Sequence, residues 1–593
     1  MNFFKIVLAS ALGYIIAAVV VFGLIAAMIV GIASSAKKEV SIKTESVLNL
    51  KLDYTIKDRM QENNPFAAFE ALDPNLTSPA GLNDILASIE QAKTDDKIKG
   101  IILDLSTLDA GYGKIMEIRT KLDEFKESGK FIYAYADYYQ YKTYYLASVA
   151  DSIFMNPEGQ MLLNGMTAQV TFLSNTLKKL GIEVDVIRHG KYKSAGEAFV
   201  RQSLSEENRK QLSEYVNSVY DNTLAQIASS RGQEVEQLKA HANSLDMTSV
   251  SEYAAAGYIE GTQYRDEFYS MMKGRMGLDD EDKVELVTVK KYSKLLDKNY
   301  EASDRIAIVY ALGDIVTGKG DGTQIAADDL VQTLKKVRET EKIKAVVLRI
   351  NSRGGSALAS EIIWREVQLL ADAKPLVVSM SDYAASGGYY IAAPAHTIVA
   401  DPTTITGSIG VFGLVPNAKK LFNDKLGMNF EYVGTGEYSD FGRIDQALEA
   451  EERAYIQEII DQIYNTFVKR VSDGRDLSPD QVDSIAQGRV WTGSMAKEIG
   501  LVDELGGLEY AVELAAKAAD LEEYKIREYP KLKDPFNQIF ERMQGNASLE
   551  QSLLRTSYGH YIKTLMDAEK LASQHSVQAM LPFAVDLKHY SLR

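Results

Sequence analysis

The longest apolar run of the chain lies at its N-terminus. Residues 6–33 contain no charged residue and are rich in Ala, Val, Ile and Leu, with Lys5 before them and Lys37 and Lys38 after them. A helix of this length would extend about 42 Å, which exceeds the roughly 30 Å hydrocarbon core of a bilayer. The run is also longer than the apolar part of a cleaved secretory signal, about 7–15 residues. The pattern predicts an uncleaved transmembrane helix over 6–33.

Beyond this run, short apolar segments alternate with amphipathic ones. Residues 345–350 (AVVLRI) form a β-branched run, and residues 351–356 (NSRGGS) form a glycine-containing turn. Apolar residues then recur at helical spacing over 357–373, and a second apolar run follows over 375–381. Strand-like runs alternating with helical periodicity are typical of βα units around a mainly parallel sheet. The pattern therefore predicts an α/β fold.

The α/β pattern occurs twice. Residues 97–103 (KIKGIIL) match residues 342–348 (KIKAVVL) at an offset of 245, and Asp137 matches Asp382 at the same offset. The register continues for more than a hundred residues, since the Glu pair at 206–207 corresponds to the pair at 451–452. Solenoid repeats have periods of about 20–50 residues, so this much longer period indicates two copies of a whole domain.

This repeat sets the expected domain organisation. We expect one transmembrane anchor, two tandem α/β domains and a C-terminal extension, at residues 6–33, 47–285, 300–522 and 523–593 respectively. The polar stretch 273–303 should contain the connection between the domains. Residues 57–80 contain three prolines and are expected to form an exposed loop after the anchor.

Composition and charge exclude several classes of function. Acidic residues outnumber basic ones by 82 to 66, for a net charge of -16, so binding to nucleic acid phosphates is not expected. The absence of cysteine excludes disulfides, thiolate metal sites and cysteine nucleophiles. The six histidines show no metal-ligand spacing. We therefore expect no dedicated metal centre, and nothing in the sequence calls for a cofactor.

The second copy carries two features of a catalytic site. Gly354 and Gly355 follow an apolar strand, and paired glycines let backbone N–H groups approach a ligand oxygen, so they form a candidate oxyanion hole. Ser386 lies among small residues in the segment DYAASGGYY, at the expected start of a helix, where developing negative charge is favoured. The first copy has Tyr141 at the position of Ser386.

A reciprocal replacement occurs further along. The first copy has Lys193, in GKYKSA, where the second copy has Ser439. One half has thus kept a lysine and the other a serine, as expected of a duplicated enzyme in which one composite site has survived. A lysine activates a serine only when its amine is neutral, a state that burial favours. Ser408, in TGSIG, is a candidate to brace that amine. Unconstrained drift between the copies is the alternative explanation.

Two histidines are alternative candidates, as the base of a Ser-His-Asp triad. His189 lies four residues before Lys193 and stays open as an alternative base. His396 follows Ser386 by ten residues and is expected at the surface, at the start of a strand.

Four motifs carry a family resemblance: NSRGGS, DYAASGGYYIA, TGSIGVFG and GKYKSAGEAF, in a tandem chain with an N-terminal apolar run. Together they resemble the signal peptide peptidase A (protease IV) family in its long, tandem-domain form. The resemblance implies a ClpP/crotonase-like fold in each half. It further implies a serine endopeptidase with a Ser–Lys dyad that hydrolyses cleaved signal peptides and other hydrophobic peptides through an acyl-enzyme.

The resemblance also implies roles for individual residues. It makes Ser386 the nucleophile, Lys193 the general base and Ser408 the support of the dyad, with oxyanion donors drawn from Gly354, Gly355 and Gly387. The chain departs from the family at Arg353, where the family usually has a proline before the two glycines. This substitution would place a cation near the oxyanion hole.

The resemblance implies a location and an assembly too. It places a homotetramer on the outer, periplasmic face of the bacterial inner membrane, anchored in the bilayer through residues 6–33. Two alternatives stay open from the residues alone. One is a crotonase-type enzyme that acts on acyl-CoA, and the other is an inactive membrane scaffold that binds hydrophobic peptides.

Overall fold

The computed structural model describes residues 13–14, 41–60, 79–296, 302–320, 322–531 and 578–580. Apart from residues 13–14, the predicted span 6–33 lies outside these ranges. Within them, no helix combines the length and apolar character needed to cross a membrane.

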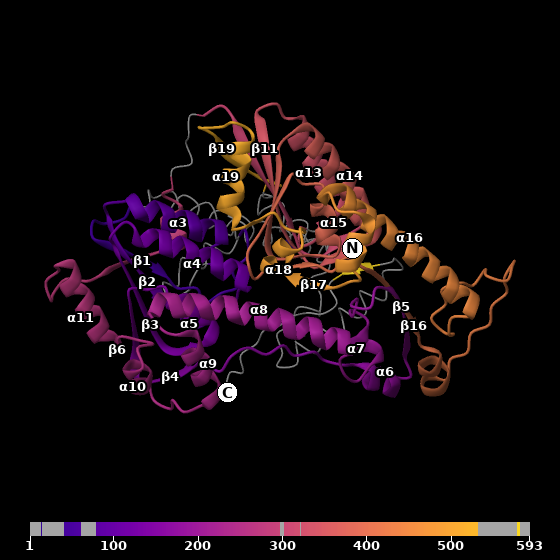
Figure 1. The fold of residues 1–593 in the computed structure, drawn as a ribbon, viewed down its shortest axis with the longest axis horizontal. Coiled ribbons are helices and arrows are strands. Elements are labelled where there is room, and N and C mark those ends of the chain that lie inside the picture. Colours follow the sequence, from indigo (N-terminus) through magenta and orange to yellow (C-terminus); the bar gives the residue numbers. More distant parts are fainter. Residues whose placement is uncertain are drawn as a thin grey trace, which may run out of the picture.

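The first repeat is built on a six-stranded sheet in which every paired strand runs parallel to its neighbour (Figure 1). The strand order is β6-β4-β3-β2-β1-β7. The strands are β1 Ser46–Leu50, β2 Ile98–Asp104, β3 Phe131–Gln140, β4 Ser152–Leu162, β6 Gly261–Thr262 and β7 Glu285–Thr288. The helices around them are α3 Leu82–Thr94, α4 Tyr112–Lys126, α5 Tyr141–Ala147, α8 Glu206–Arg231, α9 Val235–Ser244, α10 Val250–Ala255, α11 Arg265–Met276 and α12 Val289–Ser293.

The second repeat has the same strand succession, β18-β14-β13-β11-β8-β19, and β13 also pairs with β15, which pairs with β17. Its strands are β8 Arg305–Leu312, β11 Ile343–Ser352, β13 Leu376–Ala385, β14 Thr397–Ala400, β15 Ile405–Gly407, β17 Val490–Thr492, β18 Glu504–Leu505 and β19 Lys525–Tyr529. Its helices are α13 Ala327–Glu339, α14 Ala357–Ala373, α15 Gly387–Ala392, α16 Ala450–Arg475, α17 Pro479–Ile485, α18 Gly493–Glu498 and α19 Leu508–Ala518, with a π-helical turn, η1, over Leu421–Lys425. The predicted architecture of two tandem α/β repeats is confirmed.

The sequence pattern explains the core of the second repeat. Helix α14 has the limits that the periodicity predicts, and Ile363, Val367 and Leu370 on one face are fully buried. These side chains belong to the same apolar cluster as alternate residues of the central strands, such as Val346 and Leu348. Helix and sheet therefore bury one continuous core, as their two periodicities require.

A third sheet, also of six strands, joins the two repeats in the order β10-β9-β12-β20-β16-β5. Strand β5 (Glu183–His189) and the flanking helices α6 (Ser174–Leu180) and α7 (Glu197–Val200) come from the first repeat. Strand β5 pairs antiparallel with β16 (Val411–Asn417) of the second repeat over its full length. The other strands are β9 Ile315–Val316, β10 Ile325–Ala326, β12 Gly354–Ser356 and β20 Gln578–Met580. The first repeat thus extends an arm into the second, at the right of Figure 1.

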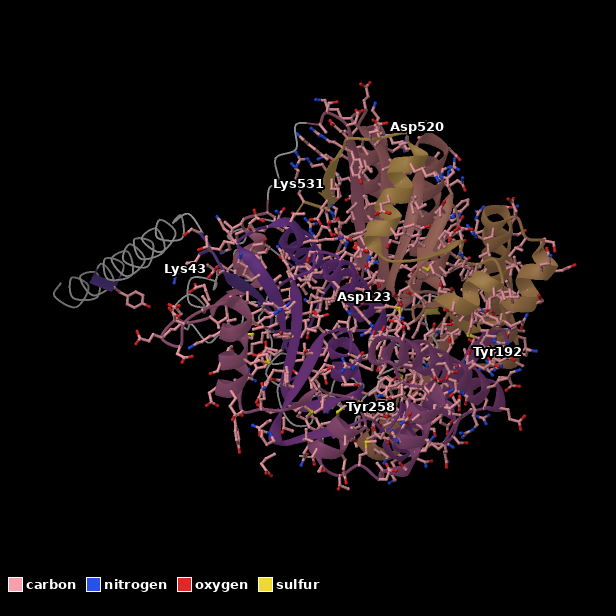
Figure 2. The ribbon with its side chains drawn as sticks, turned by 60° about the vertical axis from the view of Figure 1, so that its left-hand side comes forward. Lys43, Asp123, Tyr192, Tyr258, Asp520 and Lys531 are labelled. Atoms are coloured by element: carbon pink, nitrogen blue, oxygen red, sulfur yellow. The ribbon has the colours of Figure 1, made fainter. Side chains whose placement is uncertain are left out.

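Buried ion pairs also connect the two repeats. The Arg349 guanidinium is fully buried and binds the carboxylates of Asp58 and Glu117, both from the N-terminal half of the chain. Lys114 of α4 pairs with Asp382 of β13. Residues 57–80 are expected to form an exposed loop, and 61–78 of them lie outside the described residues. At the start of this range the expectation is corrected, because Asp58 is buried as a partner of the buried Arg349 guanidinium. In Figure 2, Asp123 of α4 lies where the repeats face each other, and Tyr192 marks the arm.

Candidate active site

Lys193 lies in the turn that follows β5, inside the second repeat. The N–H of Tyr192 donates to the carbonyl of Gln487 at 2.9 Å, which fixes the turn against the α17–β17 connection. Two glycines permit this approach. Gly190 has φ +101°, and a Cβ on Gly488 (φ +77°) would lie 2.5 Å from the Lys193 Cβ. The lysine side chain is fully buried as a result.

Ser386 lies between the end of β13 and the start of α15, as the sequence predicts. Its backbone has φ +56° and ψ −117°, a conformation that L-residues rarely adopt. Its N–H donates to the carbonyl of Gly407 at 2.8 Å, and its own carbonyl accepts from the Tyr390 N–H. Strained backbone that neighbouring structure holds in place is a common feature of functional sites. The side chain is completely buried.

The two repeats bring Lys193 and Ser386 together. Lys193 Nζ lies 2.7 Å from Ser386 Oγ, 3.0 Å from the carbonyl oxygen of Ser408 and 3.1 Å from Ser408 Oγ. All three residues have no exposed surface. Burial holds the pKa of the Lys193 amine well below its usual value. A neutral amine with three oxygen neighbours, one of them a serine hydroxyl, is equipped to accept that hydroxyl's proton.

The glycine turn lies next to Ser386. Ser352 pairs with Ala384 across β11 and β13, and a Cβ on Gly388 would lie 2.8 Å from the Ser352 carbonyl oxygen. Gly354 and Gly355 follow in β12, at φ +100° and +156°, and the Gly354 N–H donates to Ser352 Oγ at 3.1 Å. Gly387 is the first residue of α15. Part of the glycine turn is a strand, because Gly355 pairs with Ile315 of β9. The two strands lie so close that a Cβ on Gly355 would clash with the Ile315 carbonyl oxygen.

The other candidates lie elsewhere. His189 Nδ1 is 2.7 Å from Asp461 Oδ1, and its ring stacks on Tyr464 at 3.8 Å, so it contacts α16 and not the serine. His396 is exposed and its Nδ1 accepts from the Leu376 N–H, in agreement with the expected surface position.

The counterpart positions have structural roles. Tyr141, the first-repeat equivalent of Ser386, is buried and its hydroxyl bonds Thr223 Oγ1 at 2.8 Å. Ser439, the second-repeat equivalent of Lys193, is exposed and donates to the Gly436 carbonyl. The repeat offset pairs Ser386 with Tyr141 and Lys193 with Ser439. Of these four residues, only Ser386 and Lys193 contact each other.

Sequence reasoning did not identify the partner of Arg353. Its guanidinium lies 3.4 Å from Asp314 Oδ1, at a cavity of about 320 Å³ that Asn351 and Tyr383 also line. The cation that replaces the family's usual proline is thus matched by an anion. No pattern in the chain links 314 with 353, since β9 and β12 approach each other only in the folded state.

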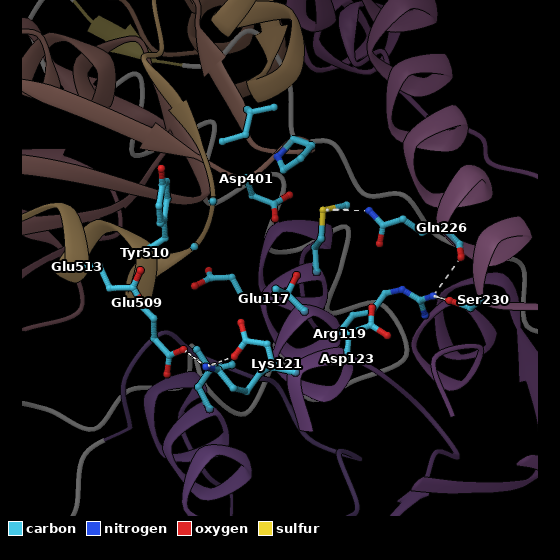
Figure 3. A pocket seen from close by; sticks show the side chains of 18 of the residues that line it. Glu117, Arg119, Lys121, Asp123, Gln226, Ser230, Asp401, Glu509, Tyr510 and Glu513 are labelled. Atoms are coloured by element: carbon cyan, nitrogen blue, oxygen red, sulfur yellow. Dashed lines mark hydrogen bonds and ion pairs between the residues drawn. The ribbon is translucent and has the colours of Figure 1, made fainter. Parts of the chain in front are cut away.

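A second cavity, of about 560 Å³, lies between the repeats and not at the serine (Figure 3). Glu117, Arg119 and Lys121 of α4 face Asp401 and Glu509 of the second repeat there. Burial raises the pKa of the Asp401 carboxyl to about 8.

Among the residues that the structure describes, no group of three or more His, Asp or Glu side chains is arranged to hold a metal ion.

The buried serine, the adjacent lysine with its lowered pKa and the glycine turn indicate the class of the protein, a serine hydrolase. The comparisons give its family. The model of Peptidase family S49 matches residues 124–279 and 368–522, once in each repeat, and the chain belongs to this family. It is a serine protease, and the predicted family resemblance is confirmed. Family membership disfavours the acyl-CoA and inactive-scaffold alternatives.

Relatives match most of the chain. It is 35% identical over 548 residues to "Serine protease SPPA, chloroplastic" of Arabidopsis thaliana, with 91% of this chain and 78% of the relative covered. It is 33% identical over 508 residues to "Protease 4" of Haemophilus influenzae, with 83% and 82% covered. The solved structure of a ClpP1 point mutant from Listeria monocytogenes matches 35% of this chain and 94% of its own, at 16% identity and a TM-score of 0.23.

Proposed function

We propose that the chain is a membrane-anchored endopeptidase in which Lys193 of the first repeat activates Ser386 of the second to hydrolyse hydrophobic peptides, among them cleaved signal peptides. The observation that carries this proposal is the 2.7 Å contact between Lys193 Nζ and Ser386 Oγ in a fully buried setting. It is supported by the position of the serine at a strained strand–helix junction. The names of the relatives, a serine protease and a protease, agree with it.

The chemistry follows from these groups. Ser386 Oγ attacks the scissile carbonyl carbon while Lys193 Nζ takes the hydroxyl proton, which it then gives to the leaving amine as the C–N bond breaks. A water molecule then attacks the acyl-enzyme, and Lys193 takes its proton and returns it to Ser386 Oγ. In both steps, N–H groups of Gly354, Gly355 or Gly387 stabilise the oxyanion. The Gly354 N–H would exchange Ser352 Oγ for the substrate oxygen.

Ser408 orients the amine in this scheme. Its carbonyl oxygen and Oγ lie 3.0 and 3.1 Å from Lys193 Nζ and can accept both amine protons of the neutral form. The nitrogen lone pair is then directed at Ser386 Oγ. The backbone of Ser408 is itself fixed, because its N–H donates to the Arg489 carbonyl at 2.7 Å.

The apolar run 6–33 supports a bilayer anchor, which would hold the site near peptides that leave the membrane and so raise their effective concentration. We place the catalytic repeats on the periplasmic face of a bacterial inner membrane. This topology rests on the family resemblance and the apolar run.

Association between chains is supported by the repeat itself, and the family resemblance implies that four chains associate. Gly113 and Glu117 of α4 pack into the second repeat, whereas their equivalents on α14, Leu358 and Ile362, are 62% and 42% exposed. Residues 429–435, equivalent to β5, form no strand and include Val433, which is 99% exposed. Apolar residues at these positions would be buried if the second repeat of one chain docked on the first repeat of the next.

Cleavage of an internally quenched hydrophobic peptide by the full chain in detergent tests the proposal. We expect Ser386→Ala and Lys193→Met each to lower kcat/KM at least about a thousandfold, as loss of a nucleophile or its base does. His189→Gln, which alters the neighbouring arm, should retain activity within a few-fold. Full activity in a folded Lys193→Met variant would refute the proposed base.

A further inference from the structure

Helix α8 carries a buried amide beside the turn that holds Lys193. The helix leads from the arm back to the body of the first repeat (Figure 1), and Gln211 near its start is 1% exposed. Gln211 Nε2 donates to the carbonyl oxygen of Tyr192 at 3.0 Å and lies 3.0 Å from Ser194 Oγ. Tyr192 and Ser194 are the two neighbours of Lys193 in the sequence. The amide therefore holds the turn on both sides of the lysine.

The oxygen of the same amide reaches the second repeat. The N–H of Val490, the first residue of β17, donates to Gln211 Oε1 at 3.2 Å. Val490 pairs with Gly407 of β15, whose carbonyl oxygen accepts the Ser386 N–H at 2.8 Å. Gly407 also directly precedes Ser408. One side chain thus connects the turn of the base with the strands that hold the backbone of the nucleophile and of the supporting serine.

The partners of this amide define its orientation. A backbone N–H requires an acceptor and a backbone carbonyl requires a donor, so Val490 faces the amide oxygen and Tyr192 the amide nitrogen. Asn208, one turn earlier on α8, adds a contact of 3.1 Å between its Oδ1 and Gln211 Nε2. The Asn208 amide in turn donates to the buried carboxylate of Glu197 at 3.0 Å. Gln211 is therefore fixed from several sides.

The two copies differ at this position as they do at the lysine. At the offset of 245, Gln211 corresponds to Ile456 of α16, which packs against the apolar core of the second repeat. The copy with Lys193 thus has the amide, and the copy with Ser439 in place of the lysine has an apolar side chain. A buried amide is costly unless its hydrogen bonds are satisfied, and those of Gln211 are made to the Lys193 turn and to β17.

We propose that Gln211 is a positioning residue for the base: its amide closes the Lys193 turn onto the second repeat, which keeps the lysine amine out of water and within reach of Ser386 Oγ. The inference rests on the proposed function, because Gln211 acts only through Lys193. A small displacement of a reacting group costs a large factor in rate, so loss of this bridge should slow the reaction without removing any reacting atom.

The surroundings of the lysine make the pKa of its amine a measure of this closure. Burial lowers that pKa, so water that enters an opened turn would raise it toward its ordinary value. The charged and titratable side chains of the surrounding elements are paired with one another: Arg188 of β5 with Glu197 of α7, His189 of β5 with Asp461 of α16, and Arg489 ahead of β17 with Glu214 of α8.

The rate at which a fluorophosphonate labels Ser386 in the full chain in detergent, measured against pH, tests this role. We expect Gln211→Met to slow labelling at neutral pH at least about tenfold and to raise the midpoint of the pH profile by at least about half a pH unit. Gln226→Met is the matched control, because Gln226 lies on the same helix and accepts from the Tyr145 hydroxyl within the first repeat. It should keep the wild-type rate and midpoint. In peptide cleavage, Gln211→Met should lower kcat and leave KM within about twofold.

A second variant covers the case in which Gln211→Met does not fold. Gln211→Asn keeps an amide in the helix but is one methylene too short to bridge Tyr192 and Val490, so its midpoint should rise as well. An unchanged midpoint in a folded variant, with or without a slower rate, would overturn the positioning role.

Lys193→Met, measured alongside, separates this inference from the proposed dyad. Labelling of Lys193→Met like the wild type would refute the proposed base, and the role of Gln211 with it. Slow labelling of Lys193→Met beside an unaltered Gln211→Met would support the dyad and refute the role of Gln211.

Discussion

At the scale of the residue, the energetics of Lys193 are the unusual feature of the molecule. Transfer of a charged amine into a site without exposed surface is costly, so burial lowers the pKa of Lys193 well below its usual value. The unfolded chain protonates the same lysine up to pH 10.5 or so. Folding therefore favours the neutral amine relative to the unfolded chain, and burial of this amine opposes stability wherever the unfolded chain keeps it charged.

This linkage predicts a pH-dependent stability that Lys193→Met abolishes. Between the lowered folded-state pKa and about 10.5, the unfolded state binds more protons, so the free energy of unfolding of the wild type should rise with pH. The slope from one group approaches about 1.4 kcal/mol per pH unit. Urea unfolding at pH 7, 8 and 9 measures it. Lys469→Met, at a lysine side chain that is 66% exposed, should keep the wild-type slope. Equal slopes in wild type and Lys193→Met would show that the buried amine keeps its proton.

The sequence predicts both members of this pair because the duplication acts as an internal comparison. Tyr141 against Ser386 and Lys193 against Ser439 identify which copy kept which group. The comparison cannot show that the Gly354 N–H is held by Ser352 Oγ, or that Arg349 needs Asp58. Those contacts join positions that carry no pattern of their own, and they follow from how strands end and helices dock.

At the scale of the element, α4 is the piece of the first repeat that fixes the second. Lys114 and Glu117 from this helix reach Asp382 and Arg349, which lie on the two strands that lead to Ser386 and to the glycine turn. Burial would raise the pKa of Asp58, but the charges of Arg349 and Lys114 outweigh it and lower that pKa to about 2. The two strands are therefore aligned with the first repeat by charge as well as by packing.

Removal of one member of this cluster should be costly. Glu117→Gln leaves Arg349 without one of its two carboxylates, and we expect a loss of about 3–5 kcal/mol in the free energy of unfolding, as for other broken buried ion pairs. Asp473→Asn breaks an exposed pair with Lys469 and should cost less than about 1 kcal/mol. Denaturant unfolding compares them. A cost for Glu117→Gln as small as the control's would show that the buried pair does not hold the repeats.

Elements were predictable where the pattern is local. The helix over 357–373 follows from its own periodicity, and the parallel strands follow from short apolar runs. The short strand β12 could not be predicted from the sequence, because it is defined by its pairing with β9 and β20, which come from other parts of the chain. The arm around β5 was missed for the same reason, since its partner β16 belongs to the other repeat.

At the scale of the whole molecule, one chain supplies both halves of the site. Strand β5 crosses to the second repeat of its own chain, and Lys193 follows it. The sequence left open whether the two residues meet within one chain or between two. In the structure the two residues meet within one chain. Under the proposed dyad, neither repeat alone would hold a complete site.

This arrangement predicts an absence of complementation. A mixture of Lys193→Met and Ser386→Ala chains, co-expressed so that mixed assemblies form, should show no more peptidase activity than either variant alone. In every chain of the mixture, the site would contain either a substituted Lys193 or a substituted Ser386. Recovery of a quarter or more of the wild-type activity would mean that Lys193 serves the serine of a neighbouring chain.

The central claim is that the buried Lys193 amine activates Ser386. The most direct measurement is the rate at which a fluorophosphonate probe labels Ser386 in the full chain, followed by mass spectrometry as a function of pH. We predict that the wild type is labelled with a single limb that rises with pH and has its midpoint well below 10.5, and that Lys193→Met loses this labelling while His189→Gln keeps it. Labelling of Lys193→Met at the wild-type rate and with the same pH profile would contradict the account.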